Sequence, residues 1–201
     1  MVTPLPYSTK VLQEAINGES TAVEKYKKFR RQALEEGFKN IAYFLRALIA
    51  AEKIHIKNHK KALGNVDYLP QIGDVSYKST LENIESGIEG ELHETKKMYP
   101  YMIKKIKKET KEISGKVVKL SLQWAKDAEK EHAARLKAIL EELKEGNEIN
   151  IKNVYICPYC GNIEFTRPKV CDVCKHDGVF FKKLQRRQEE NHSLQEEEVI
   201  H

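Results

Sequence analysis

Two Glu-x-x-His pairs are the residues of this sequence best suited to bind metal ions. Glu52 precedes His55 in the segment AEKIH, and Glu129 precedes His132 in the near-repeat AEKEH. On a helix, a spacing of three residues places both side chains of a pair on one face. Carboxylate and imidazole ligands suit iron or manganese, and zinc also accepts them. The pairs therefore predict a site for two metal ions between at least two helices.

Three more glutamates lie where apolar helical stripes require core residues. Glu19, Glu91 and Glu94 each fall near the middle of such a stripe, and no Lys or Arg occupies the stripe positions. A buried carboxylate is costly unless it is neutralised or paired. Two divalent ions, or two ferric ions bridged by an oxide, would neutralise all but one of the five negative charges. Metal ions are thus the natural source of the compensating charge.

The glutamates also indicate a duplicated helical hairpin. The dipeptide Gly-Glu occurs at 18–19 and again at 90–91, and each half supplies Glu…Glu-x-x-His, the ligand pattern of two-metal carboxylate bundles. Glu94 breaks the symmetry, because the same offset from Glu19 falls on Ala22. We interpret Glu94 as a spare carboxylate that could change its ligation as the metals change oxidation state.

All four cysteines occur in two Cys-x-x-Cys pairs, which predict one metal site with four thiolate ligands. These ligands are Cys157, Cys160, Cys171 and Cys174. The first pair, in Cys-Pro-Tyr-Cys-Gly, contains the Pro and Gly that favour a tight turn, whereas the second, in Cys-Asp-Val-Cys-Lys, contains neither. Four thiolates bind iron and structural zinc equally well, so both metals remain open.

Helical periodicity predicts four long helices that position the bundle ligands. They span approximately 8–36, 38–64, 77–109 and 112–146, and Pro100 is expected to kink or interrupt the third. A long connection joins the second helix to the third. Two hairpins linked by one crossover form an all-α four-helix bundle.

The composition divides the chain into four parts. Residues 1–146 carry the bundle, 147–152 a linker, 153–182 a small domain of short strands and loops, and 183–201 a polar tail that is frayed or disordered. The net charge of +5 comes from intermixed Lys and Glu, which argues against a nucleic-acid surface. The sequence contains no apolar stretch of membrane-spanning length and does not begin with a secretory signal, so we expect a cytoplasmic protein.

The ligand set as a whole resembles the rubrerythrin family over about residues 8–182. The matching pattern is Glu19, Glu52-x-x-His55, Glu91-x-x-Glu94 and Glu129-x-x-His132, followed by the two Cys-x-x-Cys pairs. The stretches GES, GFKNIA, ETKKMYP and VYICPYCG match as well. The resemblance implies a ferritin-like di-iron bundle joined to a rubredoxin-like iron domain. It also implies an oxidoreductase, a peroxidase that reduces hydrogen peroxide to water in oxidative stress defence.

Residue roles follow from the same resemblance. The two irons of the bundle would be held by Glu19, Glu52, His55, Glu91, Glu94, Glu129 and His132. Glu94 and His55 would exchange as ligands of one iron during the reaction. Tyr26 and Tyr99 would be hydrogen-bonded near the cluster, and the alternative is that they are core aromatics with satisfied hydroxyl groups.

The resemblance further implies partners. The cysteines would hold one iron, or else zinc, and would receive electrons from a rubredoxin or an NAD(P)H-dependent reductase. Within one chain, a helix of about 25 residues, or ~37 Å, could separate the two metal sites. Members of the family form dimers in which the rubredoxin-like domain of one chain lies beside the di-iron centre of the other. We therefore expect a homodimer.

Two questions stay open at this stage. The alternative function is ferritin-like iron binding or storage, or ferroxidase activity, with a structural zinc at the cysteines. His59 is either a satisfied core histidine or a hydrogen-bond donor behind the ligands. The remaining histidines, His93, His176, His192 and His201, are not expected to bind metal.

Overall fold

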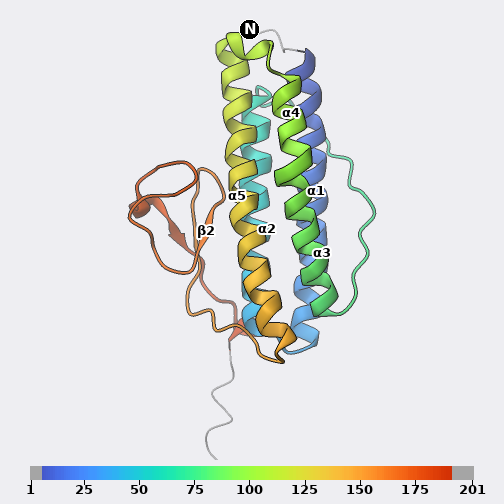
Figure 1. Cartoon of the computed structure of the whole chain (residues 1–201), viewed down its shortest axis with the longest axis vertical. Helices are drawn as coiled ribbons and strands as arrows, with labels where there is room; N and C mark the ends of the chain where they lie inside the picture. The colour runs from blue at the N-terminus through green and yellow to red at the C-terminus, as the bar shows by residue number, and fades with distance from the viewer. Residues whose placement is uncertain (1–5, 192–201) are drawn as a thin grey trace, which may run out of the picture.

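Four helical rods lie side by side and form the body of the molecule (Figure 1). The computed structural model describes residues 6–191. The rods are α1 (Pro6–Glu35), α2 (Lys39–Ala62), α3 (Thr80–His93) continued by α4 (Tyr99–Lys105), and α5 (Ile113–Lys144). The predicted four-helix bundle is confirmed. None of the helices in this part of the chain is long and apolar enough to cross a membrane.

The third rod is not one continuous α-helix. Between α3 and α4 lies the π-helical segment η1 (Glu94–Met98), where the N–H of Tyr99 donates to the carbonyl of Glu94, five residues back. Pro100 has no N–H and cannot continue an α-helical hydrogen-bond ladder here. A 3-10 turn, η2 (Glu109–Lys111), then leads into α5. The interruption predicted at Pro100 thus takes the form of a wider helical turn just before it.

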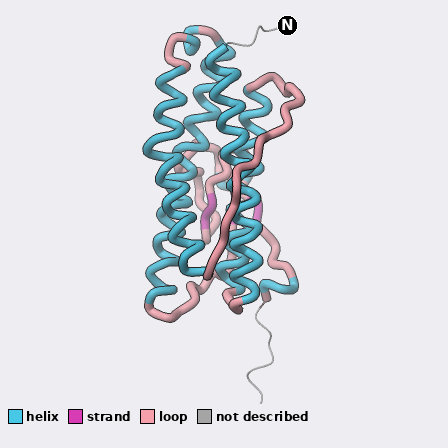
Figure 2. The backbone as a smooth tube through the Cα atoms, turned by 90° about the vertical axis from the view of Figure 1, so that its right-hand side faces the viewer, coloured by secondary structure: helices cyan, strands magenta, loops and turns pink. Residues whose placement is uncertain are grey.

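An extended connection, residues 64–79, runs along the bundle from the end of α2 to the start of α3 (Figure 2). Asn17 of α1 fastens it, because the hydroxyl of Tyr68 donates to the Asn17 side-chain oxygen at 3.0 Å. At its end, Ser79 and Glu82 form a capping box that starts α3. The two hairpins are therefore joined by the predicted crossover.

Apolar side chains fill the bundle toward both ends. One buried cluster includes Phe29 of α1 and Leu136 of α5, and another includes Leu12 and Leu122 of the same helices. The glutamates of these two helices lie on the turns between the two clusters. Water is thereby excluded on both sides of the polar middle, which raises the cost of leaving its charges uncompensated.

A small unit built around the cysteines packs against the side of the bundle. Its three antiparallel strands are β1 (Tyr155–Ile156), β2 (Ile163–Glu164) and β3 (Lys182–Lys183), in the order β2-β1-β3, and a short 3-10 turn, η3 (Gly178–Phe180), precedes β3. We call residues 153–183 the cysteine unit. Ile156 and Ile163 join the bundle's own apolar cluster, so the unit and the bundle share one core.

The structure departs from the expected disordered tail over residues 183–191. Lys183 belongs to β3, and a 3-10 turn, η4 (Gln188–Glu190), lies against the bundle. The carboxylate of Glu190 is fully buried and pairs with Arg30 and Arg46. Two arginines of the bundle thus neutralise the buried charge of this segment. Residues 192–201, with His192 and His201, lie outside the described residues.

Candidate metal centres

Buried carboxylates and imidazoles from four helices converge in the middle of the bundle. Helix α1 contributes Glu19, α2 contributes Glu52 and His55, α3 contributes Glu91, and α5 contributes Glu129 and His132. Their ligand atoms form two groups, each within 4.8 Å: Glu19, Glu52, His55 and Glu129, and then Glu52, Glu91, Glu129 and His132. Glu52 and Glu129 belong to both groups. The arrangement is that of two adjacent four-ligand sites that share two carboxylates.

The hydrogen bonds of the histidines direct their free nitrogens into these groups. The Nε2–H of His55 donates to the carbonyl of Cys160 at 2.9 Å, and that of His132 donates to the carbonyl of Gly161 at 3.1 Å. A carbonyl can only accept, so the proton of each neutral ring is on Nε2 and the Nδ1 lone pair is available. Each Nδ1 lies within 2.7 Å of a Glu129 oxygen, at which distance two lone pairs repel unless a proton or a metal cation lies between them.

The buried polar atoms of the site lack hydrogen-bond partners within the described structure. They are Glu19 Oε2, Glu91 Oε2, both carboxylate oxygens of Glu52 and Glu129, and Nδ1 of His55 and His132. Burial, followed by the charge of Glu129, raises the pKa of Glu52 and Glu91 well above the ordinary value. A pair of metal cations would bind the unpartnered acceptor atoms and compensate the charge of the buried carboxylates, so these residues fit a dimetal centre.

Two tyrosines hold the outer carboxylates. The hydroxyl of Tyr26, in the first hairpin, donates to Glu91 in the second. The hydroxyl of Tyr99, in the second hairpin, donates to Glu19 in the first. Both rings are fully buried, and burial raises the pKa of each hydroxyl well above its ordinary value, so each remains a proton donor. The structure thus places both tyrosines where the family resemblance implied.

The π-helical segment explains a mismatch between the two hairpins. Tyr26 follows Glu19 by seven residues, whereas Tyr99 follows Glu91 by eight. The wider turn η1 absorbs the additional residue, so both tyrosines reach equivalent carboxylates. The sequence contained this indication in the two offsets, but sequence reasoning did not use it.

Glu94 lies at the start of η1, beside the two ligand groups and outside both. Its side chain is half-buried. Burial, followed by the charges of Glu19 and Glu129, raises the pKa of its carboxyl well above the ordinary value. The structure therefore brings six of the seven predicted bundle ligands together and leaves Glu94 next to them.

His59 is a satisfied core histidine that also contacts the site. Its Nδ1 lies 2.8 Å from the Ser121 hydroxyl, and its Nε2 lies 3.1 Å from the Tyr99 hydroxyl. Burial lowers its pKa to about 4, so the ring is neutral at physiological pH. Both predicted readings of His59 hold, since the ring is buried and stands behind the tyrosine that holds Glu19. Ser121 was not singled out from the sequence.

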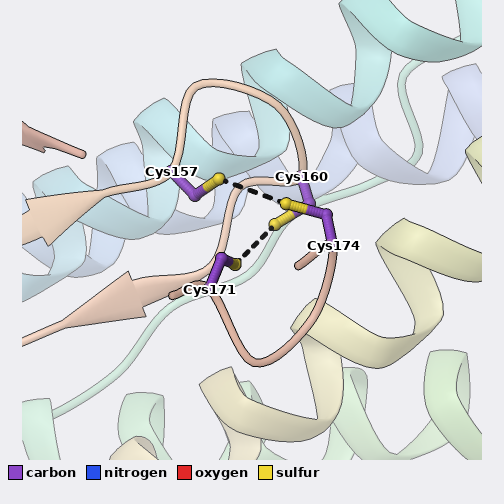
Figure 3. A group of neighbouring side chains, drawn as sticks. All are labelled: Cys157, Cys160, Cys171 and Cys174. Atoms are coloured by element: carbon purple, nitrogen blue, oxygen red, sulfur yellow. Dashed lines mark hydrogen bonds between the residues drawn. The ribbon is translucent and has the colours of Figure 1, made fainter. Parts of the chain in front are cut away.

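The four cysteine side chains point toward one another from the two knuckle loops of the cysteine unit (Figure 3). The sulfur atoms of Cys157 and Cys174 are 3.5 Å apart, as are those of Cys160 and Cys171. Ligands on a tetrahedral metal with bonds of about 2.3 Å are ~3.8 Å apart, so the sulfurs fit one ion. The second knuckle, which lacks Gly, makes its turn with Lys175 at a φ of 61°.

The first knuckle rests directly on the dimetal site of the same chain. Beyond the two histidine contacts, Asn58 of α2 donates to the carbonyl of Tyr159 at 2.6 Å, and Arg135 of α5 donates to the carbonyl of Ile163 at 2.5 Å. The expectation that the helices would separate the two metal sites within one chain was wrong. The linker allows the unit to fold back to mid-helix, where the backbone of its knuckle meets His55 and His132.

Known proteins share this combination of bundle and cysteine unit. The Rubrerythrin family model matches residues 10–140. Rubrerythrin-2 of Clostridium acetobutylicum is 34% identical over 154 residues, which cover 75% of this chain and 81% of that protein. Nigerythrin of Nitratidesulfovibrio vulgaris is 32% identical over 167 residues, which cover 80% and 79%. A structure of nigerythrin in a mixed-valence state matches with a TM-score of 0.78 at 29% identity, covering 92% of this chain and 88% of that one.

The fold and the two sites define a non-haem dimetal carboxylate protein with a rubredoxin-like four-cysteine site. The chain belongs to the rubrerythrin family. Its carboxylate–histidine centre is accordingly the di-iron site of that family. The names of its relatives, rubrerythrin and nigerythrin, are those of iron-dependent oxidoreductases.

The shared position of Glu129 predicts unequal metal losses in two variants. Glu129→Ala removes a ligand common to both groups and should reduce the bundle metals from two per chain to fewer than about one, whereas His132→Ala removes a ligand from one group and should cost about one. Metal analysis of the purified proteins measures this. Glu141→Ala, an exposed glutamate of the same helix, serves as control. Equal losses in the first two variants would contradict the shared role.

Proposed function

We propose that the chain is a non-haem di-iron peroxidase that reduces hydrogen peroxide to water with electrons delivered through iron at the four cysteines. The observation that carries this proposal is the direct contact between the two sites. The backbone of the cysteine knuckle accepts hydrogen bonds from both histidines of the bundle site. A structural zinc or an iron store would have no use for this connection, whereas a reaction that consumes electrons at the bundle requires one.

The reaction combines one peroxide molecule with two electrons and two protons and releases two water molecules. The chemistry that two bound iron ions supply is the transfer of one electron each as the O–O bond breaks. Glu19, Glu52, His55, Glu91, Glu129 and His132 hold these ions in our proposal. Glu94 lies three residues after Glu91, at the start of η1, and we assign to it the delivery of a proton or a role as an alternative ligand.

The solved relatives support redox chemistry at such a site. Nigerythrin has been observed in mixed-valence, partially reduced and fully reduced all-ferrous states. By likeness, we assign the same iron chemistry to this chain and expect three irons per chain. A content of two irons and one zinc would keep the bundle chemistry but remove the internal electron carrier, since zinc is not redox-active.

The proposal also includes the electron donor, the assembly and the location of the protein. We propose a rubredoxin or an NAD(P)H-dependent reductase as the electron donor, a homodimer as the assembly, and the cytoplasm as the location. The cysteine unit contacts the dimetal site of its own chain, so dimerisation is not required to bring the two centres together.

Glu94→Ala tests the peroxidase proposal. The variant should keep its fold and most of its metal, because Glu94 lies outside both ligand groups, yet reduce peroxide at least ~10-fold more slowly. Peroxide consumption by the reduced, iron-loaded protein measures the rate. Glu89→Ala, an exposed glutamate of α3, should leave it unchanged. Peroxide reduction by Glu94→Ala at the rate of the unmodified chain would remove Glu94 from the reaction, and no reduction by the unmodified chain would reject the proposal.

A further inference from the structure

A groove of about 490 Å³ opens where α2, α5 and the cysteine unit meet. Its walls include Lys57 and Lys61 of α2 and Lys182 of β3, and its floor includes the rings of Trp124, Tyr159 and Phe180. None of these residues takes part in the dimetal site. We call this feature the lysine–aromatic groove.

The floor of the groove is connected to a metal-binding sulfur through one stacked ring. Tyr159 stacks on His176, with ring centroids 3.9 Å apart and planes 15° apart. The Nδ1 of His176 lies 3.2 Å from the sulfur of Cys174. Cys174 is partly exposed, whereas the other three cysteines are fully buried. Packed aromatic atoms thus connect the groove to the sulfur of the partly exposed Cys174.

Another part of the first knuckle already contacts the bundle. There, the carbonyls of Cys160 and Gly161 accept the hydrogen bonds from the histidines of the bundle. One side of the four-cysteine site thus faces the centre that consumes electrons. An external donor must approach from another side, and the groove provides one with an apolar, aromatic floor.

The charge of the groove is positive and uncompensated within the described structure. Lys57 and Lys61 are four residues apart on α2 and so lie on one face, with Lys182 on the facing strand. No carboxylate lines the groove or pairs with these three lysines among the described residues. Between Lys53 and Leu63, helix α2 carries no Asp or Glu at all. An acidic surface is the electrostatic complement of such a rim.

We propose that the lysine–aromatic groove is the docking site of an external redox protein whose one-electron centre is surrounded by acidic residues. This inference rests on the proposed function, because it supplies the electrons that peroxide reduction consumes. In each encounter, the donor centre would lose one electron and a ferric ion held by Cys157, Cys160, Cys171 and Cys174 would gain it, with no bond formed or broken. The lysines attract and orient the donor, and the aromatic floor brings its centre near Cys174.

The single tryptophan of the chain gives a direct readout of groove occupancy. Trp124 lies in the floor, so binding should change its fluorescence. The probe is a small acidic [2Fe–2S] ferredoxin without tryptophan, titrated at low salt. The variant K57Q/K61Q/K182Q should bind it at least ~10-fold more weakly and with a smaller dependence on salt. The control K10Q/K116Q/K137Q removes the same charge from exposed positions outside the groove and should bind as the unmodified chain does.

The possible outcomes separate the docking site from the proposed function. Equal binding by the two triple variants would overturn the docking site. Quenching of Trp124 by free flavin mononucleotide, but not by the ferredoxin, would also overturn it in favour of a small anionic cofactor. Peroxide reduction by the dithionite-reduced chain is measured separately. If the unmodified chain bound the ferredoxin in a lysine-dependent way but did not reduce peroxide, the peroxidase proposal would be rejected and the docking site would remain supported.

Discussion

Replacing Gly161 by Ala should slow electron transfer from the four-cysteine site to the bundle site at least ~10-fold, because it separates the two centres. Gly161 has a φ of 80°, and a Cβ there would lie 2.5 Å from Nε2 of His55 and 3.2 Å from the carbonyl oxygen of Ala51. Neither neighbour can move freely, since His55 faces the ligand group and Ala51 belongs to a buried helix. The knuckle must therefore lift from α2.

The measurement is the reoxidation of the reduced four-cysteine iron after mixing with peroxide, followed by its visible absorption. The unchanged spectrum of that iron would show that the knuckle itself still folds. Gly146→Ala is a matched control, because Gly146 has a nearly identical φ of 81° but nothing within 4 Å of its Cβ position. Both variants carry the same backbone strain, and only one carries the clash. If both transferred electrons at the same rate, the contact at His55 would not be the route.

The contact at Gly161 illustrates what the sequence could not predict. Gly161 was recognisable as a turn glycine after the first Cys-x-x-Cys pair, and His55 as a ligand in a helical Glu-x-x-His pair, because both patterns are local. They meet because the carbonyl of Cys160, next to Gly161, accepts a hydrogen bond from the His55 side chain, 105 residues earlier in the chain. Every residue has such a carbonyl, so no residue type marks it in the sequence.

The ligands of the dimetal site were predictable for the opposite reason. A glutamate in an apolar helical stripe is conspicuous in one sequence, and helical periodicity then fixes the face on which Glu52 and His55 lie. Periodicity does not fix the level at which separate helices meet. Glu94 matched the pattern as well as Glu91 did, but the structure places Glu94 at the π-helical turn, beside both ligand groups.

Residues 183–191 were misread because burial of charge is invisible in composition. The run KLQRRQEEN has the composition of a solvated or disordered tail. Glu190 nevertheless becomes fully buried, because Arg30 and Arg46 lie 160 and 144 residues earlier in the chain and meet it on the bundle surface. Only the tertiary arrangement distinguishes this glutamate from its exposed neighbours.

Replacing Glu190 by Ala should destabilise the docked cysteine unit by about 3 kcal/mol, because the largely buried Arg46 loses its carboxylate partner and Arg30 loses the buried one of its two. The Glu190 carboxylate accepts from Arg46 Nη2 at 2.6 Å, from Arg30 Nη2 at 2.9 Å and from the Arg187 N–H at 3.0 Å. Glu189→Ala is the matched control. That neighbour makes one ion pair with Arg30 at the surface and should cost less than about 1 kcal/mol.

Urea unfolding, followed by the visible absorption of the four-cysteine iron, measures the free energy for the unit. The effect should depend on pH. Burial raises the pKa of Glu190, but the hydrogen bonds from Arg46, Arg187 and Arg30 outweigh it and hold this pKa below the ordinary 4.5. The stabilisation is thus fully present above pH 4.5 and is lost as the pH falls through the lowered value. The difference in stability between the unmodified chain and Glu190→Ala should therefore shrink progressively as the pH falls below 4.5. A difference that did not shrink on acidification would show that the Glu190 charge does not supply this stability.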